Sequence, residues 1–141
     1  VNGTITRNWH WRLSYAYTEY VDDSGGDRFN RYPPHHLILR QAYTWQDGKL
    51  QGLTLSGAMR FRDRSMQTFM GRYLDSNYYF DTSMVFDAAL DLDLARFGIE
   101  NAGVTLGIRN IFDEAYAESA RHNQAFPGDP RTYTVSIHKT F

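Results

Sequence analysis

Apolar and small polar residues alternate strictly along the final stretch of the chain, Arg131 to Phe141. Tyr133, Val135 and Ile137 fall on one side of an extended strand, and the small polar residues between them fall on the other. Such alternation predicts a strand with one apolar and one polar face. The stretch closes on the aromatic Phe141, which a membrane barrel seats in an interfacial girdle of aromatic side chains.

The same alternation predicts a partial strand over residues 1–6 and further strands over residues 9–18, 37–45, 53–62, 80–94 and 104–112. The longest run, 80–94, decides between helix and strand. A helix would scatter its four Asp residues around the cylinder, whereas a strand places Asp81, Asp87, Asp91 and Asp93 on one face. We therefore interpret it as a strand and expect these carboxylates to pair with arginines on neighbouring strands, namely Arg60, Arg62 or Arg109.

The connections between these strands alternate between long and short. Long polar loops are expected after Tyr20, after Arg62 (63–79) and after Phe112 (113–130), with a short helical turn over 114–121 as a minor option. The other ends have a turn at 7–8, a connector at 95–102, and a hairpin at 46–49 in which Asp-Gly supplies positive φ angles. Outer-membrane barrels have short periplasmic turns and long extracellular loops. The long loops are therefore predicted to be extracellular.

Composition agrees with this interpretation and excludes several classes of protein. The chain has 141 residues and a net charge of −1, so no nucleic-acid partner is indicated. It contains no Cys, hence no disulfide and no thiolate metal site. No apolar run approaches the length of about 18 residues that a spanning helix needs.

A soluble antiparallel sheet with one buried face is the alternative fold. Two features count against it. The expected strands run to about 9–12 residues, against about 5–6 in soluble sheets. The polar face also carries charged residues that could line water, such as Arg12, Arg40 and Arg60. We predict an all-β chain that forms an antiparallel transmembrane β-barrel segment of about six to seven strands in the bacterial outer membrane.

Three motifs connect the chain to a known family. They are Arg109 to Tyr116 (R-N-I-F-D-E-A-Y), Pro127 to Thr132 (P-G-D-P-R-T) with the terminal Phe, and Arg31 to His36 (R-Y-P-P-H-H). In this order and spacing, the chain resembles the C-terminal part of TonB-dependent outer-membrane receptors, particularly the ferric-siderophore group. The residues that carry the resemblance and that we expect to serve assembly are Asn110, Phe112, Asp113, Tyr116, Gly128, Pro130, Arg131 and Phe141.

The resemblance implies a larger protein than the strands found here. The family folds as a 22-stranded barrel filled by an N-terminal plug domain, with a TonB-contacting box ahead of the plug. Residues 1–141 would be the C-terminal part of that barrel, with no plug domain in this chain. The implied partners are a ferric siderophore, the TonB complex through the N-terminal part, outer-membrane lipid, and the barrel assembly machinery through the C-terminal strand. No cofactor is implied.

The resemblance also suggests where a ligand would bind. A ferric siderophore needs aromatic surface for its organic shell and cationic groups for its oxygen-rich core. In the family such groups lie on the plug apices, the upper barrel wall and the extracellular loops. The candidates here are Arg62, Arg64, Tyr73, Tyr78, Tyr79, Arg121, His122 and Phe126. Arg60 and Arg109, which face the lumen, are expected to hold the plug instead.

Catalytic and metal-binding interpretations are weaker. Asp113 and Glu114 are adjacent, so on a strand they point to opposite faces and do not converge on one substrate. The sequence has no serine-nucleophile motif and no phosphate-binding glycine loop. An outer-membrane hydrolase would have to rely on His122 with Asp129. We predict neither an enzyme nor a metal site.

Two other functions stay open at this stage. A small complete outer-membrane barrel could act as an adhesin or structural protein, since bacterial barrels with as few as eight strands exist. A receptor for haem, cobalamin or another nutrient would use the same wall. The strand pattern does not distinguish these ligands.

Overall fold

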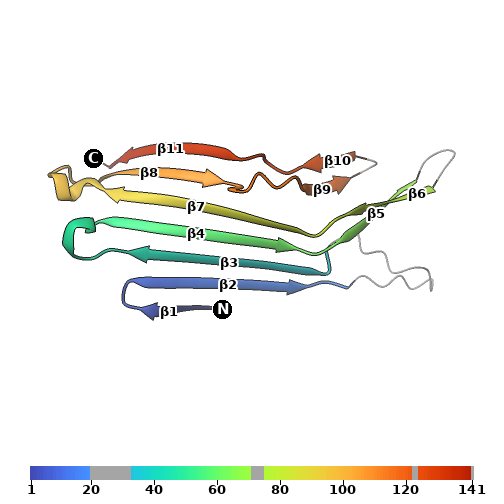
Figure 1. Cartoon of the computed structure of the whole chain (residues 1–141), viewed down its shortest axis with the longest axis horizontal. Helices are drawn as coiled ribbons and strands as arrows, with labels where there is room; N and C mark the ends of the chain where they lie inside the picture. The colour runs from blue at the N-terminus through green and yellow to red at the C-terminus, as the bar shows by residue number, and fades with distance from the viewer. Residues whose placement is uncertain (20–32, 71–74, 122–123, 141) are drawn as a thin grey trace.

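The computed structural model describes residues 1–19, 33–70, 75–121 and 124–140. Seven strands form one antiparallel sheet in the order β1-β2-β3-β4-β7-β8-β11 (Figure 1). The strands are β1 (Asn2–Thr6), β2 (Trp9–Tyr17), β3 (His35–Thr44), β4 (Leu53–Arg62), β7 (Ser83–Asp93), β8 (Ala102–Arg109) and β11 (Thr132–Lys139). The seven strands lie side by side in the order in which they occur along the chain, as in the wall of an up-and-down barrel. This confirms the predicted all-β antiparallel segment.

Two smaller hairpins extend beyond one end of the sheet (Figure 1). One pairs β5 (Ser65–Met70) with β6 (Asp75–Phe80), and the other pairs β9 (Ala117–Arg121) with β10 (Gln124–Pro127). The long connections predicted over 63–79 and 113–130 are present, but each contains a hairpin that the sequence did not predict. The predicted helical turn at 114–121 is wrong, because residues 117–121 form β9. Both segments do project from the end at which long connections were expected.

Short turns close the opposite end. Arg7 and Asn8 join β1 to β2, while the 3₁₀ turns η1 (Gly48–Leu50) and η2 (Leu94–Phe97) lie between β3 and β4 and between β7 and β8. The prediction for 46–49 needs correction, because Asp47 has a φ of −149° and the positive φ angles fall on Gly48 and Gly52. Within the described ranges, no helix is long and apolar enough to span a membrane.

Side chains alternate between the two faces of the sheet as the sequence predicts. The apolar face stays exposed: Tyr133, Val135 and Ile137 on β11 are 72%, 68% and 76% accessible. In the described part of the chain, the only buried apolar residues are Val85 and Ala102. A sheet with almost no core of its own needs an apolar medium against this face, which lipid supplies.

Candidate functional site

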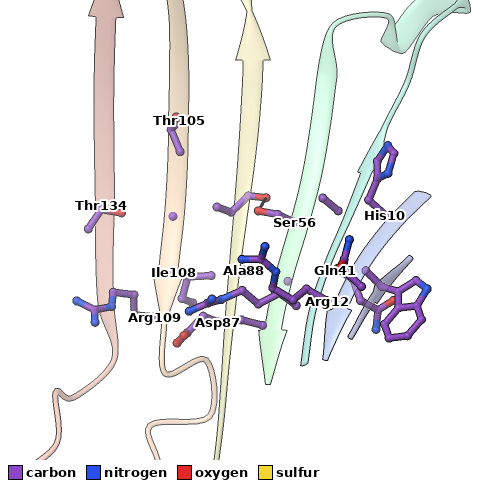
Figure 2. A pocket seen from close by; sticks show the side chains of 18 of the residues that line it. His10, Arg12, Gln41, Ser56, Asp87, Ala88, Thr105, Ile108, Arg109 and Thr134 are labelled. Atoms are coloured by element: carbon purple, nitrogen blue, oxygen red, sulfur yellow. Dashed lines mark hydrogen bonds between the residues drawn. The ribbon is translucent and has the colours of Figure 1, made fainter. Parts of the chain in front are cut away.

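The polar face of the sheet is hollowed. A pocket of about 650 Å³ extends across this face and is lined by residues of all seven strands, from Asn2 on β1 to Thr134 on β11. Figure 2 shows small side chains such as Ser56 and Thr134 across it, with Arg12 toward one side and Arg109 toward the other. The pocket is open along the face of the sheet, so it belongs to the inner wall of the segment.

The four carboxylates of residues 80–94, three of which lie on β7, were expected to pair with arginines on neighbouring strands, and one does. The Asp87 Oδ2 atom lies 3.2 Å from the Arg60 Nη2 atom, and both side chains are about one-quarter exposed. The Asp91 carboxylate accepts a hydrogen bond from the Thr105 hydroxyl instead. Asp93 caps η2, its Oδ1 atom accepting from the Ala95 N–H at 2.9 Å. Asp81 forms no ion pair within the described residues.

Asn110 connects the end of β8 to both segments that lead into and out of the β9–β10 hairpin. Its side chain is buried, with 1% accessible, and its backbone has a left-handed φ of 51°. Its amide N–H donates to Asp87 Oδ1 at 2.9 Å. Its Nδ2 donates to the carbonyls of Glu114 and Asp129 at 2.9 and 3.0 Å, and its Oδ1 accepts from the Glu114 N–H at 2.8 Å. We call Asn110, Asp87, Glu114 and Asp129 the Asn110 junction.

Two further motif residues hold the entry to β11. The Asp113 Oδ1 atom accepts from the Arg131 N–H at 2.8 Å, and the Arg131 guanidinium lies 3.9 Å from Asp113 Oδ2. The Pro130 carbonyl accepts a hydrogen bond from the Thr132 hydroxyl at 2.9 Å. The Asp113 carboxylate therefore stabilises the turn before β11, whereas Glu114 contributes its backbone N–H and carbonyl to the Asn110 junction.

Phe112 and Tyr116, the two aromatic residues of the first motif, have different surroundings. Phe112 is 71% exposed and meets Phe86 edge-on at 5.4 Å between ring centroids. Tyr116 is only partly exposed. Its ring lies where a Cβ on Gly128 would be, and the Gly128 N–H donates to the Tyr116 carbonyl at 2.8 Å. Gly128 thus leaves space for the ring and fixes the base of the hairpin.

Arg62, a predicted ligand residue, is used inside the structure. Its Nη1 donates to the carbonyls of Ala117 and Glu118 at 3.3 and 2.7 Å and lies 3.9 Å from the Glu118 carboxylate. The guanidinium therefore ties the end of β4 to the start of β9. With its side chain only 26% exposed, it has little surface left for a ligand.

The other predicted ligand residues occupy the two hairpins or their bases. Arg64, which is exposed, lies over the ring of Tyr79 at 4.5 Å, and Tyr79 is 51% accessible. Phe126 on β10 is 46% accessible. Tyr78 lies on β6 and Arg121 on β9. Tyr73 and His122, and the assembly residue Phe141, lie outside the described residues.

Sequence reasoning missed the central place of Asp87, which receives both Arg60 and the Asn110 N–H. The alternation of residues along β7 predicted the face on which Asp87 lies. It did not predict the hydrogen bond from the Asn110 N–H, because Asn110 follows a different strand, β8. Among the residues described, no group of three or more metal-binding side chains occurs.

The curated relatives of the chain named below are receptors, although no protein-family model matches it. A ferrichrome outer membrane transporter and phage receptor of Escherichia coli (strain K12) is 34% identical over 110 residues, which cover 75% of this chain and 14% of the relative. A metal-pseudopaline receptor, CntO, of Pseudomonas aeruginosa (strain PAO1) is 28% identical over 144 residues, or 96% of this chain and 19% of the relative. The chain thus spans less than a fifth of the length of these relatives.

Two solved structures of similar fold are also receptors. The pyoverdine receptor FpvA of Pseudomonas aeruginosa PAO1, bound to pyoverdine, matches with a TM-score of 0.84 and 22% identity over 99% of this chain and 20% of its own. The ferric-catecholate import receptor Fiu of Escherichia coli K12 matches with a TM-score of 0.74 and 20% identity over 96% and 19%. Together the sequence and the fold confirm the resemblance to the C-terminal barrel segment of TonB-dependent outer-membrane siderophore receptors.

Proposed function

We propose that the chain supplies the C-terminal wall strands and extracellular hairpins of a receptor that imports a ferric siderophore across the outer membrane, driven by TonB. The observation that carries the proposal is that both hairpins, β5–β6 and β9–β10, project from the same end of the sheet. The opposite end of the sheet has only short turns. The relatives named above, which handle ferrichrome, pseudopaline complexes and pyoverdine, support it. The TonB complex would act through parts of the receptor other than this wall.

Within that receptor, Arg64 and Tyr79 are the pair best suited to contact the ligand. A guanidinium stacked on an exposed tyrosine offers both a cation and an aromatic surface, the two features that an oxygen-rich iron complex with an organic shell requires. Phe126 adds a second exposed aromatic ring on the other hairpin. Arg62 belongs to the support of that hairpin.

Ligand uptake by the intact receptor tests the proposal. A strain that lacks the receptor is complemented with wild-type protein, and uptake of radioactive iron is measured with a panel of hydroxamate, catecholate and mixed siderophores under iron limitation. We expect uptake of one class, reduced about tenfold or more by the double variant Arg64→Ala/Tyr79→Ala, since losing a charged stacking pair from a desolvated site costs roughly 2 kcal/mol. Phe97→Ala is the matched control, because Phe97 is 61% exposed and stacks with Arg96 at the opposite end of the wall.

Other outcomes would assign a different ligand. The CntO relative, a metal-pseudopaline receptor, makes a receptor for a complex of another metal the second candidate, so the panel includes chelates of divalent metals other than iron. Uptake of haem or cobalamin alone would move the protein to another nutrient class. Wild-type cells that take up none of these compounds would refute a transport role and favour an adhesin or structural barrel.

A further inference from the structure

The apolar face of the sheet has a hollow of about 590 Å³, centred on β3, β4 and β7. Its floor is formed by two small residues, Gly57 and Ala88, which are direct cross-strand partners. Large apolar side chains surround the floor: Trp9, Leu39, Tyr43, Leu55, Met59 and Phe86. We call this site the outer hollow. Its volume is in the range of about 300–1,000 Å³ that is usual for ligand pockets.

The strand register places the outer hollow on the lipid-facing side of the wall. One cross-strand row of the sheet runs through Gln41, Gly57, Ala88, Ile108 and Tyr133. Residues of one such row point to the same face of a sheet. Tyr133 belongs to the exposed apolar face of β11, so the outer hollow opens toward the same medium.

A polar side chain borders the outer hollow. Gln41 lies on β3 between Leu39 and Tyr43 of the same face, and its Oε1 atom accepts a hydrogen bond from Trp9 Nε1 at 3.1 Å. Because an indole N–H can only donate, Trp9 fixes the amide with its oxygen toward the indole and leaves the Nε2 group for another partner. No acceptor for Nε2 occurs among the residues that the structure describes. In an apolar medium a donor without an acceptor is costly, so Gln41 requires an acceptor from its surroundings.

The position of Gln41 along β3 indicates which acceptor is at hand. The strand ends at Thr44, on the side of the short turns, about 10 Å from Gln41 along the chain direction. Barrel strands are tilted, so the distance along the membrane normal is smaller. Trp9 and Tyr43, which are paired with each other, lie toward the same end, and such aromatic residues mark membrane interfaces. The Gln41 amide is therefore near the boundary between hydrocarbon and headgroups, where the ester carbonyls of a glycerophospholipid lie.

We propose that the outer hollow binds one diacyl glycerophospholipid. An acyl chain packs against Gly57 and Ala88, and an ester carbonyl of the same lipid accepts a hydrogen bond from Gln41 Nε2. The chain gains van der Waals contact on several sides, which a flat wall does not offer. The ester carbonyl is an acceptor with no donor of its own, so it complements the amide group that Trp9 leaves unpaired. The inference needs only the location of the wall in the outer membrane and does not depend on what the receptor transports.

Native mass spectrometry of the intact receptor tests the site by counting bound lipids. The receptor is released from detergent in the presence of added phosphatidylethanolamine, and the dissociation constants of the first and later lipid molecules are compared. We expect the first to bind at least about tenfold more tightly than the next. The diether analogue has the same chains and headgroup but no ester carbonyl. It should bind about fivefold more weakly, as expected for the loss of one neutral hydrogen bond.

Substitutions separate the two parts of the site. Gln41→Leu should weaken binding of the ester lipid about fivefold and make the ester and ether lipids bind equally. Gly57→Leu should weaken binding of both lipids about tenfold or more, because the leucine side chain occupies the outer hollow. A Cβ atom at Gly57 meets only the Asp87 carbonyl oxygen, at 3.7 Å, so the sheet accommodates a side chain there. Val135→Leu, on the lipid-facing side of β11 and outside the outer hollow, is the matched control and should change binding less than about twofold.

Three results would overturn the assignment. They are equal affinities of the wild-type receptor for the first and later lipids, equal binding of the ester and ether lipids to the wild-type receptor, and a Gly57→Leu variant that binds as tightly as wild type. A receptor dimer that Gly57→Leu dissociates would also overturn it, because the outer hollow would then be an interface between two copies.

Discussion

Removal of the Asn110 side chain is the sharpest test of how the end of the sheet that carries the β9–β10 hairpin is held together. Asn110 is buried, has a φ of 51°, and its side chain forms three hydrogen bonds, to the Glu114 carbonyl, the Glu114 N–H and the Asp129 carbonyl. Asn110→Ala removes all three bonds and leaves the Glu114 N–H without that acceptor. The left-handed backbone conformation also suits Asn better than Ala.

The expected loss follows from these contacts. Each hydrogen bond contributes about 1 kcal/mol net, so three contribute about 3 kcal/mol. Placing Ala at a positive φ adds about 1 kcal/mol, for a total of about 4 kcal/mol. Asn101 provides a matched control, since it has a φ of 55° and is exposed, and its side chain forms no hydrogen bond within the described residues. Asn101→Ala should therefore cost only the backbone part, about 1 kcal/mol.

The assay is urea unfolding of the intact receptor in lipid bilayers, combined with hydrogen exchange of the β9 and β10 amides. We expect the free energy of unfolding to fall by about 3 kcal/mol more for Asn110→Ala than for Asn101→Ala. Exchange in the hairpin should also accelerate only in the first variant. Asn110→Asp should be no milder than Asn110→Ala, because a carboxylate would face two carbonyl oxygens and lie beside Asp87. Equal losses for the two alanine variants would refute a structural role for the hydrogen-bond network.

Two further predictions concern the wall and the hairpin. Val135→Arg, at the middle of the lipid-facing side of β11, should lower the free energy of unfolding in bilayers by about 2–4 kcal/mol. Its neighbour Ser136→Arg, on the polar face, should change it by less than about 1 kcal/mol, and similar losses for both would contradict the assignment of faces. Arg62→Gln should weaken the tie between β4 and β9 by about 1.5–3 kcal/mol and speed hydrogen exchange in β9 and β10. Arg109→Gln should have a much smaller effect, because that arginine and its partner Asp129 are both more than half exposed; equal exchange in the two variants would show that Arg62 does not hold the hairpin.

The strands and their faces could be predicted because each face meets a different medium. Val135 and Ile137 must meet lipid while Thr134 and Ser136 must not, so the alternation is imposed on the sequence and remains visible in it. The prediction that Asp87 pairs with Arg60 followed from the same reasoning. In the structure this pair is diagonal, since Asp87 is opposite Ala58 and Arg60 is opposite Val85.

The two small hairpins could not be predicted in this way. In the stretch from Ser65 to Met70, polar and apolar residues do not alternate, and the same is true from Asp75 to Phe80. A hairpin that leaves the wall has no lipid-facing side, so the two-residue period is not imposed there. The Asn110 junction was also hidden, because its partners Asp87, Glu114 and Asp129 come from separate parts of the chain. Only the resemblance singled out Asn110, and it did so without giving the contacts.

The absence of a conventional core from the described sheet gives these polar contacts their importance. In a soluble domain, the base of a projecting hairpin can rest on buried apolar side chains, but here almost all apolar residues face outward. The β9–β10 hairpin is instead held by directional contacts from three sides: Asn110 at both of its ends, Tyr116 against Gly128 at its base, and Arg62 across from β4. Hydrogen bonds fix a position more narrowly than apolar packing does, so they can present exposed residues such as Phe126 at a defined place above the wall. This separates the residues of the rim into two groups. Those bonded to backbone, including Arg62, set the geometry, and those whose side chains remain exposed, including Arg64 and Tyr79, are free to vary with the ligand.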